Sequence, residues 1–267
     1  MHAANGEDVV RPVVERALTV LRARPSALVS DIDGTLSRIA ERPEEAYVSD
    51  RVRAALTRLR NRVGLVGVIT ARPKDVAQRM VGVLGIEYVG SYALRTGPSE
   101  EGANLEAARE LVPSILARFP GAMFEEKGIS FALHYRGCEE PERVRPELLE
   151  LISSAARASG GKILEGKRVI EVVPASLPDK GTAFAIMMLE HGITGTVFMG
   201  DDLSDVAVFQ EIRRRRKQGL EGAAIGIVDD ETESSIVATA DLTLGGVDAV
   251  EEFLERLADG LENGGRL

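Results

Sequence analysis

Short apolar runs that alternate with helical patterns constrain the fold of this chain more than any other feature of its sequence. Residues 27–29, which lead to Asp31, and residues 63–69 are apolar and bounded by turn-forming residues, as buried strands are. Residues 9–23, 50–60 and 73–84 carry apolar side chains at helical spacing. Strands that alternate with helices favour a parallel, doubly wound sheet. The other expected elements of this kind are strands at 86–89, 196–199, 223–228 and 236–244 and helices at 181–190, 205–216 and 247–258.

The middle of the chain has a different character. A polar, Gly-rich stretch at 98–104 indicates a linker, and alternation at 129–135 indicates a half-exposed antiparallel strand. Helical patterns at 105–118 and 141–158 and two strand-like pieces around Gly166 complete an α+β segment with one solvated face. We therefore expect an α/β fold with a Rossmann-like parallel-sheet core and an inserted α+β cap. The expected boundaries are 1–96 and 177–267 for the core and 97–176 for the cap.

The composition of the chain limits the kinds of molecule that it could bind. The 267-residue chain has a formal net charge of −9, which argues against nucleic acid as a main partner. A small phosphorylated substrate remains compatible, because a local cationic pocket can form in an acidic protein. Its single cysteine, Cys138, excludes an intramolecular disulfide and a cysteine-based zinc site. There is no signal-peptide pattern and no apolar window long enough to span a membrane, so we expect a cytoplasmic protein.

Two carboxylates follow the first apolar run, in the string Asp31-Ile32-Asp33-Gly34. Carboxylates at the end of a buried strand are costly unless a partner such as Mg²⁺ compensates them. Asp31 could attack phosphorus, and Asp33 could protonate the leaving oxygen and later activate water. Gly34 permits a sharp turn whose N–H groups face a phosphate. The alternative is a turn in which the Asp side chains bond local amides.

Similar polar residues follow two other predicted strands. Thr70 ends the second strand before a helix, a place that suits phosphate binding or an ordinary helix cap. The stretch 200–205 places three carboxylates after an apolar strand, where they complete a metal site or cap a helix. Lys180 opens a helix and could balance both a nucleophile and a phosphate. Because ligands bind beyond the carboxyl ends of parallel strands, these elements together predict one site.

In this order and spacing, the four elements resemble the motifs of the haloacid dehalogenase-like phosphatases. The resemblance implies a phosphatase with Mg²⁺ as cofactor, Asp31 as nucleophile and Asp33 as acid and base. It implies that Thr70 and Lys180 contact the phosphate. The metal ligands that it implies are Asp31, the Asp33 carbonyl and Asp201, with Asp202 and Asp205 supporting the metal or Lys180.

The segment from Phe124 to Arg136 and the stretch 166–181 are similar to the trehalose-6-phosphate phosphatases. The resemblance implies that Glu125, Lys127 and Glu171 hold sugar hydroxyls and that His134 and Arg136 orient the site. For these residues, the alternative is a cap strand with an ordinary surface ion pair. This chain departs from the family where Thr70-Ala71-Arg72 replaces Ser-Gly-Arg and where 90–93 lacks the usual Gly-x-His-Gly turn.

The expected function is Mg²⁺-dependent hydrolysis of a sugar phosphate, trehalose 6-phosphate above all, through an aspartyl-phosphate. Three alternatives stay open at this point. One is a phosphatase for sucrose 6-phosphate or a glycosyl-phosphoglycerate, and another is a sugar phosphomutase. The third is a regulator that binds a sugar phosphate without catalysis. The two departures weaken the case for trehalose 6-phosphate as the particular substrate but leave the core chemistry intact.

Overall fold

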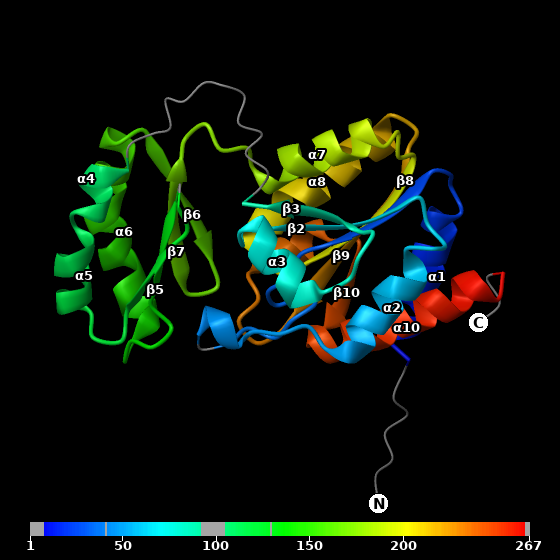
Figure 1. The fold of residues 1–267 in the computed structure, drawn as a ribbon, viewed down its shortest axis with the longest axis horizontal. Coiled ribbons are helices and arrows are strands. Elements are labelled where there is room, and N and C mark those ends of the chain that lie inside the picture. Colours follow the sequence, from blue (N-terminus) through cyan, green and yellow to red (C-terminus); the bar gives the residue numbers. More distant parts are fainter. Residues whose placement is uncertain (1–7, 41, 92–104, 129, 265–267) are drawn as a thin grey trace, which may run out of the picture. The chain divides into compact units, whose positions relative to one another are not determined.

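A computed structural model of the chain describes residues 8–40, 42–91, 105–128 and 130–264. The chain divides into two compact units, Met1–Ser91 with Lys180–Leu267 (unit 1) and Tyr92–Asp179 (unit 2) (Figure 1). The expected linker at 98–104, Tyr92, Ala93 and Ile129 lie outside the described residues.

Unit 1 contains a six-stranded sheet in which all neighbouring strands are parallel. Its strand order is β10-β9-β8-β1-β2-β3. The chain order reverses between β1 and β8, and ligands bind at such reversals in doubly wound sheets. The predicted Rossmann-like core is therefore confirmed. The strands are β1 (Ser26–Ser30), β2 (Leu65–Thr70), β3 (Glu87–Gly90), β8 (Gly195–Gly200), β9 (Glu221–Val228) and β10 (Leu242–Gly245).

Helices cover both faces of this sheet because its central strands are apolar on both sides (Figure 1). On one face, Leu28, Val66 and Val197 join a core with the apolar stripes of α1, α2, α3 and α10. On the other face, Phe198 lies between the rings of Phe184 and Phe209, which belong to α7 and α8. The helices are α1 (Val10–Leu21), η1 (Pro43–Glu45, a 3-10 helix), α2 (Asp50–Leu59), α3 (Lys74–Val81), α7 (Lys180–Glu190), α8 (Leu203–Lys217), α9 (Ser234–Thr239) and α10 (Gly246–Glu262).

Unit 2 is a four-stranded antiparallel sheet of order β4-β5-β7-β6 with helices on one face (Figure 1). Phe131, Leu133, Ile170 and Val172 point from β5 and β7 into a core shared with these helices. The single cysteine, Cys138, is buried in the same core. The elements are α4 (Glu106–Arg109), α5 (Val112–Arg118), β4 (Met123–Glu126), β5 (Phe131–His134), α6 (Pro141–Ala158), β6 (Gly161–Gly166) and β7 (Val169–Pro174).

Two predicted elements are wrong in detail, and one strand was not predicted. The strand expected at 236–244 is helix α9 followed by β10, and Ile236 of α9 packs on Gly226 of β9. Tertiary packing here overrides the strand preference of β-branched residues. The helix expected at 105–118 is split into α4 and α5, because Pro113, in the first turn of α5, has no N–H group that could bond back to the carbonyl of Arg109 in α4. Strand β4 gave no recognisable pattern in the sequence.

Among the residues that the structure describes, no helix combines the length and the apolar character needed to cross a membrane. The arginine run at the end of α8 is engaged within unit 1. Arg214 pairs with Glu211 and Arg216 with Asp241, while Arg213 and Arg215 donate to backbone carbonyls. These contacts are typical of an ordinary helix end.

Candidate active site

A buried lysine joins two buried carboxylates at the carboxyl edge of the unit 1 sheet. Lys180, the first residue of α7, has a side chain that is 1% exposed. Its Nζ lies 2.9 Å from Oδ2 of Asp31 and 2.6 Å from Oδ1 of Asp205. Asp31 follows β1, and Asp205 lies in the first turn of α8. A buried charge needs such partners, because an unpaired one is strongly destabilising.

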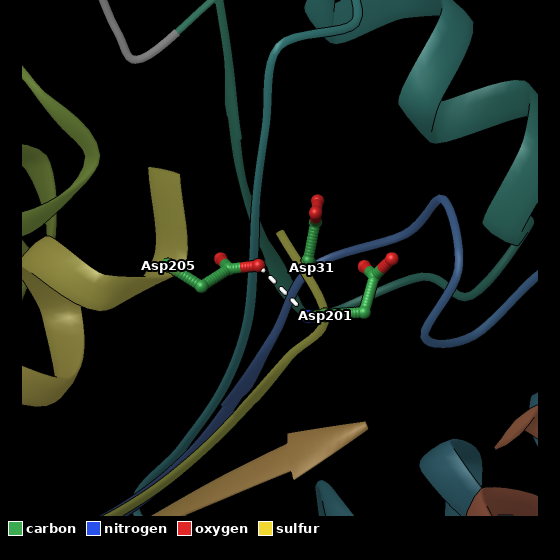
Figure 2. Close-up of side chains that lie close together, drawn as sticks. All are labelled: Asp31, Asp201 and Asp205. Atoms are coloured by element: carbon green, nitrogen blue, oxygen red, sulfur yellow. Dashed lines mark hydrogen bonds between the residues drawn. The ribbon is translucent and has the colours of Figure 1, made fainter. Parts of the chain in front are cut away.

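Asp201 completes a group of three carboxylates. Oxygen atoms of Asp31, Asp201 and Asp205 lie within 4.8 Å of one another, and all three residues are buried (Figure 2). This donor set of carboxylate oxygens, held together by the fold, could hold a metal ion. Gly34 lies against Asp201, since a Cβ at position 34 would be 2.0 Å from Asp201 Oδ2. Its φ of +77° also favours glycine, so the turn after Asp33 is built around Asp201.

The environment of Asp31 disfavours its charged form. The pKa of Asp31 is raised to about 7, chiefly by burial; the Asp205 and Asp33 carboxylates contribute to the rise, and the Lys180 ammonium opposes it. A divalent cation beside these carboxylates would oppose that shift, because it favours the charged form. The electrostatics of the cluster therefore fit a cation-binding site as well as its geometry does.

The acidic stretch at 201–205 also begins a helix. Asp202 is the N-cap of α8. Oδ2 of Asp205 accepts from the backbone N–H of Asp201 (Figure 2) and from that of Asp202. Asp205 thus fixes the loop that carries Asp201 and also pairs with Lys180. Both interpretations of this stretch, the helix cap and the acidic cluster, describe the same residues.

Asp33 is held by an arginine whose partner could not be predicted from the sequence. Arg72 donates from Nε to Oδ2 and from Nη2 to Oδ1 of Asp33, each at 2.7 Å, and from Nη1 to the Pro43 carbonyl at 3.0 Å. The paired geometry fixes the carboxylate in one plane. In the sequence, the only sign of this contact is an arginine two residues after Thr70. No local pattern shows that its side chain reaches Asp33.

Thr70 is buried at the end of β2, the strand beside β1. Its hydroxyl accepts from the backbone N–H of Arg72 at 3.2 Å. Thr70 therefore shapes the turn that carries Arg72, and its place at the sheet edge agrees with the expected phosphate contact without testing it.

In unit 2, four of the five predicted sugar-binding residues lie in one group. Phe131, Leu133, Ile170 and Val172 face the helices, so the alternating residues Ala132, His134 and Glu171 face the other way. We call this side, with Glu125, which is paired with Ala132, the polar face of unit 2.

Lys127 joins the polar face through its ammonium group. Its Nζ lies 3.3 Å from Glu171 and 3.8 Å from Glu125, and Glu125 lies 2.8 Å from Nε2 of His134. The fifth predicted residue, Arg136, donates to the Lys167 carbonyl at 3.2 Å. Ser130, which the sequence analysis did not single out, donates to Glu171 at 2.8 Å.

Comparison with known proteins points to one family. The pattern of the family described as trehalose-phosphatase matches residues 29–242. A trehalose-phosphate phosphatase of Mycolicibacterium paratuberculosis is 32% identical over 91% of this chain and 65% of its own length. A probable trehalose-phosphate phosphatase D of Arabidopsis thaliana is 27% identical over 86% of this chain and 66% of its own length. The chain thus spans about two thirds of the length of these curated relatives.

Solved structures share the fold. The C-terminal domain of Candida albicans trehalose-6-phosphate phosphatase matches with a TM-score of 0.77 at 19% identity, over 93% of this chain and 96% of that one. A haloacid dehalogenase-like hydrolase of Bacteroides thetaiotaomicron matches with a TM-score of 0.56 at 13% identity, over 88% of this chain and 100% of that one. At these identities, the likeness supports the α/β architecture alone.

Proposed function

Since this chain belongs to the trehalose-phosphatase family, we propose that it hydrolyses a sugar phosphate, most specifically trehalose 6-phosphate, to the free sugar and phosphate. The observation that carries the proposal is the buried cluster in which Lys180 joins Asp31 and Asp205 beside Asp201. A cluster of this kind combines a carboxylate nucleophile, a cation for the phosphate and oxygen ligands for a metal.

The metal that suits the cluster is Mg²⁺, which the side chains of Asp31 and Asp201 and the Asp33 carbonyl would hold. Carboxylate and carbonyl oxygens are the donors that Mg²⁺ prefers, and it commonly binds through few protein ligands and a substrate phosphate. When bound, Mg²⁺ would neutralise charge on the phosphate and on the carboxylates around it. Asp205 would support this site indirectly, because its oxygens already hold Lys180 and the backbone of the 201–202 loop.

The protein side chains divide the remaining chemistry between them. Asp31 attacks phosphorus and forms an aspartyl-phosphate, while the bond from phosphorus to the sugar oxygen breaks. Asp33 gives its proton to that oxygen and then takes a proton from the water that hydrolyses the intermediate. Lys180 and Thr70 bind phosphate oxygens, as do N–H groups near Gly34. Arg72 holds Asp33 at the site, so Asp33 must first release one of its bonds to Arg72 and carry a proton on the freed oxygen before it can donate to the leaving oxygen.

Unit 2 would supply recognition of the sugar. The polar face offers carboxylate acceptors from Glu125 and Glu171 and a donor from Lys127, which suit sugar hydroxyl groups. His134 is oriented by Glu125, and Arg136 lies just after the same strand. We assign unit 2 the role of a substrate-specificity cap on this basis.

The first test is phosphate release from a panel of sugar phosphates with Mg²⁺, with EDTA as the metal-free control. We expect Mg²⁺-dependent release with trehalose 6-phosphate preferred, and loss of turnover in Asp31→Asn. Release only from other sugar phosphates would overturn the substrate assignment. Conversion to an isomeric sugar phosphate, or full activity in Asp31→Asn, would overturn the proposed mechanism.

A further inference from the structure

Ser130 is a buried hydroxyl at the tip of the β4–β5 hairpin, 3% exposed. The hairpin is closed by a bond from the Lys127 N–H to the Ser130 carbonyl at 3.0 Å. Gly128 lies between them with a φ of +80°, as a tight hairpin turn requires. The turn therefore places the side chains of Lys127 and Ser130 at the same end of the polar face.

The two side chains hold opposite oxygens of one carboxylate. Ser130 Oγ donates to Glu171 Oε1 at 2.8 Å, and Lys127 Nζ lies 3.3 Å from Glu171 Oε2. Glu171 itself is 9% exposed and paired across β5 and β7 with Ala132. Its other cross-strand neighbour is Leu164 of β6, and neither Ala132 nor Leu164 has a polar side chain, so Ser130 and Lys127 are the partners that orient the Glu171 carboxylate.

From this geometry we propose that Ser130 is a positioning residue for sugar recognition, acting through Glu171. The inference rests on the proposed function, because it assigns Ser130 a part in binding the sugar of a sugar phosphate. With Lys127 as its only partner, the Glu171 carboxylate could still rotate about the bond that joins it to the rest of the Glu171 side chain. Ser130 fixes the second oxygen, so that the carboxylate presents one orientation to a hydroxyl group.

The bond from Ser130 to Glu171 explains why an apolar residue of similar size at position 130 would not orient the Glu171 carboxylate. Alanine at position 130 would leave Oε1 of a buried carboxylate without this donor, and the carboxylate would turn toward another donor. Threonine keeps the hydroxyl and adds one methyl group. The substitution pair Ser130→Ala and Ser130→Thr therefore separates the hydroxyl from the space that the side chain fills.

The test measures kcat and KM with trehalose 6-phosphate and with p-nitrophenyl phosphate, which has no sugar. We expect Ser130→Ala to raise KM for trehalose 6-phosphate about tenfold, the scale of a lost hydrogen bond to a charged group. The change with p-nitrophenyl phosphate should be far smaller, and Ser130→Thr should restore KM. The matched control is Ser26→Ala, which removes another buried hydroxyl, bonded to the Leu21 carbonyl at 3.0 Å.

A double-mutant cycle with Glu171→Ala decides whether Ser130 acts through Glu171. If it does, Ser130→Ala adds no further loss in the Glu171→Ala background. Additive losses, or equal losses on both substrates, would overturn the inference while leaving the proposed function in place. A wild-type protein with no Mg²⁺-dependent release from trehalose 6-phosphate would instead overturn the proposed substrate, and the inference with it.

Discussion

At the scale of single residues, the site depends on how a few buried charges are shared. Lys180 has two carboxylate partners, Asp31 and Asp205, and each of these has a further task. Asp31 is the proposed nucleophile, and Asp205 holds the backbone of the 201–202 loop. A change at Lys180 would therefore disturb both the chemistry and the fold around it.

Lys180→Met should destabilise the protein by about 3–5 kcal/mol, because it leaves two buried carboxylates without their shared cation. The measurement is urea unfolding at pH 8, followed by circular dichroism. The matched control is Lys74→Met, at the first position of α3. A loss no larger than that of the control would contradict the view that Lys180 is structurally required.

Arg72→Met should lower kcat on trehalose 6-phosphate by about 10²-fold, the usual scale of general acid–base catalysis, with little change in KM. Asp33 would lose the guanidinium that holds both of its oxygens. The control is Arg79→Met, which removes an exposed arginine that pairs with Asp75 on the same helix. A rise in KM with kcat unchanged would show that Arg72 binds substrate rather than positioning Asp33.

The residue types of this site could be predicted from the sequence, but not all of its contacts. Asp31, Thr70 and Asp201 follow apolar strands, and topology alone brings the ends of such strands to one edge. The partner of Arg72 could not be predicted, because it depends on how the loop after β1 folds back over the end of β2. The contact of Ser130 with Glu171 could not be predicted either, because it depends on the register of β5 and β7.

At the scale of elements, α2 and α10 are joined by a series of ion pairs along their exposed sides. Arg51 pairs with Glu251 and Glu255, and Arg58 pairs with Asp259 and Glu262. These arginines lower the pKa values of Glu255 and Glu262 below the ordinary value of 4.5. The series lies beside an apolar contact that holds both helices to the sheet.

Because the folded-state pKa values of these carboxyls are lowered, their contribution to stability is present above pH 4.5 and is lost as the pH falls through the folded values. Arg58→Gln should therefore reduce the acid-induced fall in unfolding temperature below pH 4.5, and 0.5 M NaCl should shrink the difference. Thermal unfolding from pH 3 to 7 measures it. Identical acid profiles for wild type and variant would show that the pairs contribute nothing.

Element boundaries followed from the sequence where local pattern and packing agree. The buried strand at Leu65–Thr70 and the helix at Leu203–Lys217 match their patterns closely. The segment 234–239 does not, because Ser-Ser-Ile-Val-Ala-Thr suits a strand locally while only Ile236 is buried, on Gly226. Packing on β9 and α8 decides the structure of such a weak segment, and no local pattern reports that packing.

At the scale of the whole molecule, the two units have separate apolar cores, and the acidic cluster belongs to unit 1 alone. A ligand of that cluster should therefore stabilise unit 1 directly. Hydrogen exchange resolves this, because it reports the opening of each segment separately.

At about 100 times its dissociation constant, Mg²⁺ should raise the free energy of opening around β1 and β8 by up to about 2.7 kcal/mol. Hydrogen exchange of these strands should slow accordingly. The segments β5 and β7 of unit 2 should change much less. Asp201→Asn is the control, and its exchange should respond little to Mg²⁺. Equal protection of both units, or an undiminished response in Asp201→Asn, would contradict a metal site within unit 1.

The single thiol of the chain reports on one part of the molecule only. Cys138 is buried in the unit 2 core, and burial raises the pKa of its thiol, so a labelling reagent reacts slowly while that core is closed. The native sequence thus contains its own chemical probe, with no engineered cysteine needed. The labelling rate of Cys138 would measure how often unit 2 opens, and unit 1, whose sequence has no cysteine, would add no background to that signal.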